Sequence, residues 1–142
     1  MGYEICENFN WPIFARDPGE FWQRWHMSLA GFCRYYVYLY VVGLSRSYFL
    51  AFLLTMVTMG LWHDLTLQWV LWGVHHAIGL YGFVRLRAAL SRRDWLNQFN
   101  SVGWIVPRVL LTGAYVTLGY AWVAAPSVTA AVDILAIALG VK

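Results

Sequence analysis

The chain has 142 residues, the size of one domain, but its composition is unlike that of a soluble domain. Hydrophobic residues make up 61% and charged residues 12%, against about 45–50% and about 25% in ordinary globular domains. This excludes a disordered chain. Ten Lys and Arg against seven Asp and Glu give a net charge of only +3 with no basic stripe, which argues against nucleic-acid binding. We therefore expect an all-α, polytopic membrane protein, with about three transmembrane helices plus amphipathic interfacial helices.

The residue pattern of positions 1–46 predicts an interfacial amphipathic helical segment. Asp17-Pro18-Gly19-Glu20 has the pattern of a helix start, with Asp as N-cap, Pro first and Glu third. In one continuous helix after it, Phe21, Trp25, Ser28/Leu29 and Phe32 would form a single stripe. Such an aromatic helix tends to lie in the membrane interface. The acidic, mixed start of the chain has no signal-peptide pattern, so we expect the spans themselves to direct targeting.

Residues 47–142 predict the transmembrane helical segment. Ser47–Trp62 would form a helix of about 24 Å, short for a hydrocarbon core of about 30 Å, whereas Leu65–Val84 would reach about 30 Å. His63 and Asp64 join these two helices, which we expect to be antiparallel, with Asp64 capping the second. A third span is expected over Val109–Ala125.

Four arginines after the second span, Arg85, Arg87, Arg92 and Arg93, predict a compact basic loop. The positive-inside rule assigns this loop to the cytoplasm, so the His63 joint would open to the opposite side. Pro126-Ser127 then opens a helix over Val128–Leu139, in which Asp133 disfavours a full span.

The four histidines, His26, His63, His75 and His76, are the conspicuous polar groups. An ionisable residue in a membrane segment is a candidate for function, although a histidine can also serve only to join helices. Adjacent histidines point about 100° apart on a helix, and no pair has a ligating interval, so we expect no metal. A Ser-His-Asp catalytic triad is also disfavoured, because the sequence has no G-x-S-x-G motif to supply its serine.

Helical spacing distinguishes two neighbouring histidines. Trp69, Trp72 and His76 recur at intervals of three and four, which predicts one aromatic face that includes His76 and leaves out His75. A packed interhelical stripe is the structural interpretation of this face, and a substrate-binding wall is the functional one.

Several stretches, in this order, resemble the C-terminal signature of the membrane-bound O-acyltransferase family, in the bacterial branch that includes alginate O-acetyltransferases and D-alanine transfer proteins of teichoic acids. The stretches are Glu7-Asn8-Phe9-Asn10-Trp11-Pro12, Glu20-Phe21-Trp22-Gln23-Arg24-Trp25-His26-Met27-Ser28-Leu29, Tyr36-Val37-Tyr38, Gly60-Leu61-Trp62-His63, Leu71-Trp72-Gly73-Val74-His75-His76 and Leu118-Gly119-Tyr120-Ala121-Trp122. The resemblance covers nearly the whole chain.

The resemblance implies acyl transfer from a thioester donor to a hydroxyl of a cell-envelope polysaccharide, inside a tunnel in the bacterial inner membrane. The donor would be coenzyme A or carrier-protein phosphopantetheine, used as substrate with no bound cofactor. Acetyl is the expected group. Membrane lipid and separate envelope proteins of polysaccharide modification would be the partners.

The same resemblance assigns catalytic residues. The family's signature histidine corresponds to His63 and its supporting histidine to His26. An imidazole is the right group to take a proton from an attacking hydroxyl near neutral pH. The expected substrate-binding residues are Trp25, Trp62, Trp72 and His76. Trp62, Trp69 and Trp72 would limit access of water.

Departures from the family pattern keep two alternatives open. Asp64 replaces the glycine usual after the signature histidine, and Arg34-Tyr35-Tyr36 lacks an acid of the family's run. Family members also have many more spans. We therefore expect the C-terminal part of such an enzyme; the alternatives are a non-catalytic membrane subunit for assembly or interaction, and a transport component with a histidine proton relay.

Overall fold

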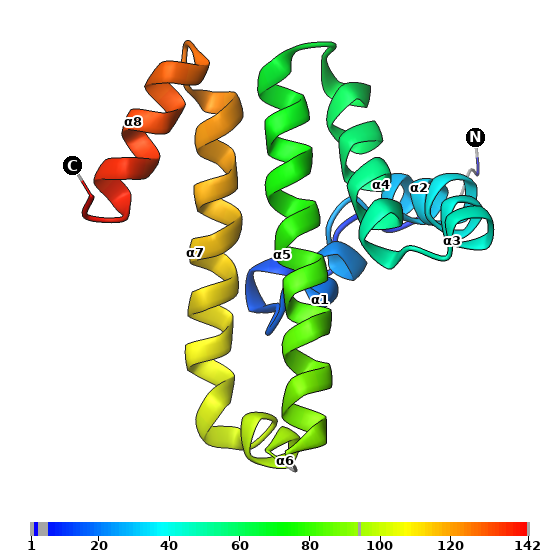
Figure 1. Ribbon diagram of the computed structural model, residues 1–142, viewed down its shortest axis with the longest axis vertical. Coiled ribbons are helices and arrows are strands. Elements are labelled where there is room, and N and C mark those ends of the chain that lie inside the picture. Colours follow the sequence, from blue (N-terminus) through cyan, green and yellow to red (C-terminus); the bar gives the residue numbers. More distant parts are fainter. Residues whose placement is uncertain (1, 3–5, 94, 142) are drawn as a thin grey trace.

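The computed structural model describes residue 2 and residues 6–93 and 95–141, and this part of the chain is helical without strands (Figure 1). The helices are α1 (Pro18–Arg24), α2 (Met27–Cys33), α3 (Leu39–Ser45), α4 (Tyr48–His63), α5 (Leu67–Arg92), α6 (Leu96–Phe99), α7 (Ile105–Ala124) and α8 (Val128–Ala138). Short turns of 3-10 helix lie at Pro12–Phe14 (η1) and Val102–Trp104 (η3), and a π-helical turn at Arg34–Tyr38 (η2). The expected all-α class is confirmed for the described residues.

Helices α4 and α5 form an antiparallel hairpin, as their tight joint predicts (Figure 1). They approach closely because glycines face the partner backbone: a Cβ on Gly73 would lie 2.7 Å from the carbonyl oxygen of Met56, and one on Gly60 would overlap the carbonyl of Trp69. Any side chain at these positions would force the helices apart.

Helix α7 runs antiparallel to α5 on the side away from α4 (Figure 1). Two hydrogen bonds join them: Nε2 of His75 lies 3.1 Å from the carbonyl oxygen of Tyr115, and the Tyr115 hydroxyl donates to the carbonyl of His75 at 2.5 Å. The two rings are stacked with centroids 4.6 Å apart. Helix α8 packs against α7 and starts after Pro126-Ser127, as predicted; Ser127 is its N-cap and accepts from the backbone of Ala130.

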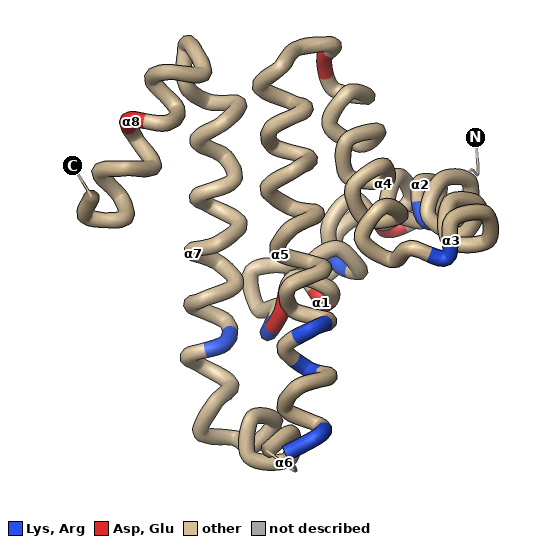
Figure 2. The backbone as a smooth tube through the Cα atoms, viewed as in Figure 1, with Lys and Arg blue, Asp and Glu red and all other residues tan. Residues whose placement is uncertain are grey.

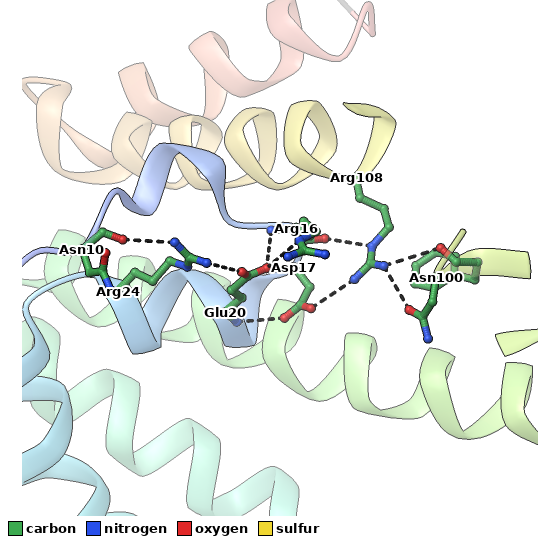
Figure 3. Close-up of polar contacts among 8 residues, drawn as sticks. Asn10, Arg16, Asp17, Glu20, Arg24, Asn100 and Arg108 are labelled. Carbon is green, nitrogen blue, oxygen red and sulfur yellow. Dashed lines mark hydrogen bonds and ion pairs between the residues drawn. The ribbon is translucent and has the colours of Figure 1, made fainter. Parts of the chain in front are cut away.

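Helix α1 packs against both α5 and α7. The predicted helix start is confirmed, because the Asp17 carboxylate accepts from the Glu20 backbone at 2.8 Å. Glu20 pairs with Arg24 at 2.6 Å, and Arg108 of α7 pairs with Asp17 at 3.3 Å (Figure 3). Arg108 also donates to the backbone carbonyl of Arg16. This network fixes α1 to the first half of α7.

Two local predictions for the α4–α5 region are wrong. Asp64 does not cap α5: the N-cap is Thr66, and Asp64 is an exposed residue that follows α4. The basic loop is instead the last part of α5, which continues to Arg92 because residues 85–92 are rich in Leu, Ala and Arg and contain no Gly or Pro. Basic residues therefore lie along the end of α5 opposite to the Asp64 turn (Figure 2).

Two stretches, Met27–Ser45 and Val102–Ala124, are long and apolar enough to cross a membrane, judged by length and composition. Shorter apolar helices are Tyr48–His63 and Val128–Ala138. Helix α5 is not among them, because polar side chains such as His75 and His76 lower its mean hydropathy. The count of about three spans, and the division at residue 46 into an interfacial and a transmembrane segment, stay predictions.

Candidate active site

A cavity of about 340 Å³ lies between α1, α2, α4, α5 and α7. Three of the four histidines line it: His26, His63 and His76. His75 does not, as the helical spacing predicts. Residues from segments more than 50 positions apart in the sequence thus meet at one site. The remaining walls are mainly aromatic and apolar and include Phe21, Trp22, Trp25, Leu29, Met59, Trp69, Trp72, Val116 and Tyr120.

His63 is the last residue of α4 and stands at the exposed side of the cavity. Its imidazole stacks on the Trp69 indole, with centroids 4.4 Å apart and an interplanar angle of 14°. The Trp62 ring lies 4.9 Å from His63 and 5.7 Å from His26, edge to face with both. Trp62 is 60% exposed and is not a wall of the cavity, so it covers the two histidines from outside.

His26 lies at a break between α1 and α2, so the single helix predicted through this region is wrong. Trp25 is extended and His26 has a left-handed backbone, with φ 48°. The break is stabilised by distant partners: the amides of Met27 and Ser28 donate to the backbone and side-chain oxygens of Asn8, each at 2.9 Å. These bonds satisfy groups at the start of α2 that a continuous helix would satisfy internally. Local spacing could not reveal them.

His76 lies on the inner side of the cavity and is 1% exposed. Its ring contacts those of Trp72 and Trp22, with centroids 4.6 and 5.1 Å away. Three buried nitrogens of cavity residues have no hydrogen-bond partner: Nδ1 of His26, Nδ1 of His76 and Nε1 of Trp22. A buried polar atom without a partner costs about 1–3 kcal/mol. These three nitrogens are covered by neighbouring atoms, so they are buried polar groups rather than accessible points on the cavity wall.

The predicted site residues are thus partly assembled by the fold. His26, His63, His76, Trp25 and Trp72 line one cavity, and Trp62 lies beside it. The wall from α7 was missed by the sequence analysis. Its members are Thr112, Gly113, Val116, Thr117, Tyr120 and Val123. Their helical spacing was a signal that could have identified this face.

The cavity has no permanently charged group among the described residues that line it. None of these residues is Asp, Glu, Lys or Arg, so the histidines are the titratable groups most suited to proton transfer there. Within the described residues, no three His, Cys, Asp or Glu side chains are grouped to hold a metal ion. The arrangement offers imidazoles in an aromatic, partly enclosed space, which suits acid–base chemistry on a polar substrate.

Comparison with known proteins adds independent evidence. A sequence model of the membrane-bound O-acyltransferase family matches residues 5–123. Among similar proteins, a probable alginate O-acetylase AlgI of Pseudomonas aeruginosa is 32% identical over 82% of the chain and 22% of its own length. A teichoic acid D-alanyltransferase of Streptococcus thermophilus is 37% identical, over 75% and 28%. A peptidoglycan O-acetyltransferase of Helicobacter pylori is 27% identical, over 90% and 24%. The chain thus spans about a quarter of the length of these relatives.

Proposed function

Because the chain belongs to the membrane-bound O-acyltransferase family, as its motifs predict, we propose that it forms the part of such an enzyme that carries the acyl-transfer site. The observation that supports this most strongly is that His26 and His63, far apart in the sequence, line one cavity. A role in assembly alone would not require them to face a shared space.

In the proposed reaction His63 acts as general base. Its neutral imidazole accepts the proton of the acceptor hydroxyl while the hydroxyl oxygen attacks the thioester carbonyl. The resulting tetrahedral oxyanion collapses, the carbon–sulfur bond breaks, and the proton passes from His63 to the departing thiolate. His26, on the same cavity, would donate a hydrogen bond to the oxyanion.

The aromatic walls would hold the substrates and limit water. Trp25 and Trp72 line the cavity, and Trp62 covers both catalytic histidines from outside. Water that enters such a site would hydrolyse the thioester, so this cover protects the acyl group. His76, on the inner wall of the cavity, would contact the substrate.

We further propose that the transferred group is acetyl. Relatives of similar identity include acetyl and D-alanyl transferases by name. A D-alanyl group carries an ammonium, which is costly to place in a partly dry site without a negative partner. The described cavity walls contain no carboxylate, so they suit a neutral acyl group better.

The other substrates follow from the same proposal. The donor is a thioester of coenzyme A or of carrier-protein phosphopantetheine, and the acceptor is a cell-envelope polysaccharide, modified together with other envelope proteins. We place the protein in the bacterial inner membrane, with the basic end of α5 towards the cytoplasm and the Asp64 turn towards the other side.

Deletion of the gene in its host tests this proposal. Mild alkali releases both acetate and D-alanine from ester links to envelope polysaccharide, so both are measured before deletion, after deletion and after restoration of the intact gene. We expect acetate to disappear on deletion and to return on restoration. Loss of D-alanine instead would contradict the acetyl assignment, and no change in either would favour the non-catalytic alternative.

A further inference from the structure

We propose that Asn8 is a positioning residue that holds His26 in the cavity from outside its own helix. This inference rests on the proposed function of His26, and it concerns a residue eighteen positions upstream in the sequence. It follows from how the break between α1 and α2 is stabilised.

Asn8 makes three hydrogen bonds to the residues that follow His26. Its backbone oxygen accepts from the Met27 amide at 2.9 Å. Its side-chain oxygen Oδ1 accepts from the Ser28 amide at 2.9 Å and from the Ser28 hydroxyl at 2.8 Å. The Asn8 side chain therefore supplies the cap at the start of α2, which the side chain of His26, the N-cap residue, does not supply.

The cap matters because the backbone conformation of His26 is energetically unfavourable. A φ of 48° lies in the left-handed region, which L-residues with a side chain adopt only when their surroundings impose it. In the relaxed alternative, α1 would continue through Trp25 and His26 into α2, and the imidazole would point in another direction. The bonds from Asn8 oppose this relaxation.

The imidazole of His26 also lacks an orienting partner of its own. Its Nδ1 is buried with no hydrogen-bond partner, whereas a catalytic histidine is commonly oriented by a carboxylate or carbonyl on its second nitrogen. The ring instead has aromatic neighbours: Phe9 at 5.9 Å and Trp62 at 5.7 Å between centroids. Phe9 follows Asn8 directly, so the segment Asn8-Phe9 both stabilises the backbone conformation of His26 and flanks its ring.

Three substitutions test this role. Asn8→Ala removes both side-chain bonds, whereas Asn8→Asp keeps an oxygen that accepts from Ser28. Asn10→Ala is the matched control, because both hydrogen bonds between Asn10 and Arg24 involve only backbone atoms of Asn10 and survive the change. All variants are made in the intact protein in its membrane, and thermal unfolding verifies that each is folded.

The first measurement is independent of activity. Diethyl pyrocarbonate modifies accessible neutral histidines, and mass spectrometry of the peptide that contains His26 gives the rate. We expect a several-fold faster modification of His26 in Asn8→Ala, with no change in Asn10→Ala and recovery in Asn8→Asp. Equal rates in Asn8→Ala and Asn10→Ala would overturn the inference.

The second measurement separates positioning from the proposed chemistry. With acetyl thioester as donor, Asn8→Ala should lower kcat by about tenfold to a hundredfold with little change in KM, as expected for a misplaced catalytic group, and Asn8→Asp should recover most of the rate. If His26 becomes more reactive while transfer is unaffected, Asn8 does position His26 and the role of His26 in the proposed function is wrong. If transfer falls while the reactivity of His26 stays at the control rate, Asn8 does not act through His26.

Discussion

The imidazole of His63 lies parallel to the indole of Trp69, with ring centroids 4.4 Å apart. Trp69 belongs to the first turn of α5, just across the turn from the end of α4. The last residue of one helix is thus held by the first turn of the next. We expect this stack to set the direction of the His63 ring towards the cavity.

Replacement of Trp69 tests this stack. An aromatic pair contributes about 0.5–1.5 kcal/mol beyond its buried area. Trp69→Leu should therefore lower the rate of acyl transfer by up to about tenfold if this energy holds the ring in place, and Trp69→Phe should retain most of it. Steady-state kinetics with acetyl thioester measure both. Equal rates in the two variants would show that the stack does not position His63.

Helix packing gives a prediction about stability. Gly73→Ala places a methyl group against the backbone of Met56 and should destabilise the protein by about 1–3 kcal/mol or more. Gly82→Ala is the matched control on the same helix, because a Cβ there has nothing within 4 Å. It should be neutral or stabilise by about 0.5–1 kcal/mol. Thermal unfolding in one detergent compares them, and the reverse order would contradict the described contact of α4 and α5.

The ion pair between α1 and α7 gives a second stability prediction. The side chains of Arg108 and Asp17 are only 11% and 14% exposed, so Arg108→Gln leaves a carboxylate largely buried without its cation. We expect a loss of about 1–3 kcal/mol. Arg92→Gln changes an exposed arginine of α5 and should have little effect. If the two variants unfold at the same temperature, this pair does not anchor α1.

The environment of Glu20 predicts that the unfolding temperature of the protein depends on pH. Burial favours its neutral form, but hydrogen bonds from the Arg16 backbone and the Arg24 side chain, with the charges of both arginines, outweigh burial and lower the pKa of Glu20. A carboxyl whose pKa is lower in the folded state stabilises that state above its unfolded pKa, and this contribution is lost as pH falls through the folded value. The unfolding temperature should therefore fall as the pH is lowered below about 4.5. Glu20→Gln should weaken this dependence, and an unchanged slope would contradict it.

The sequence could predict those parts of the molecule that depend on local pattern. Examples are the Asp17 cap, the start of α8 after Pro126-Ser127 and the α4–α5 hairpin. The helical spacing also predicts that His76, and not His75, faces the cavity. The order of the family motifs indicated the family without any structure.

The parts that were missed have different physical causes. The break at His26 depends on Asn8, and no residue of the local helix pattern encodes it. Hydropathy alone predicts only a span at α7, and the helical spacing of its residues is the signal that distinguishes the face lining the cavity. The cluster of arginines after the second span predicts a loop, but their Leu and Ala neighbours favour helix, so α5 continues to Arg92.

The most direct test of the account is the rate of acyl transfer by His63→Gln in the intact protein. Glutamine retains much of the size and polarity of histidine but cannot act as general base, and loss of such a base costs about a hundredfold to ten-thousandfold. His75→Gln, which changes a histidine outside the cavity, is the control. We predict that His63→Gln loses at least about a hundredfold in rate while His75→Gln stays active. Equal activity of His63→Gln and the unaltered protein would contradict the proposed active site.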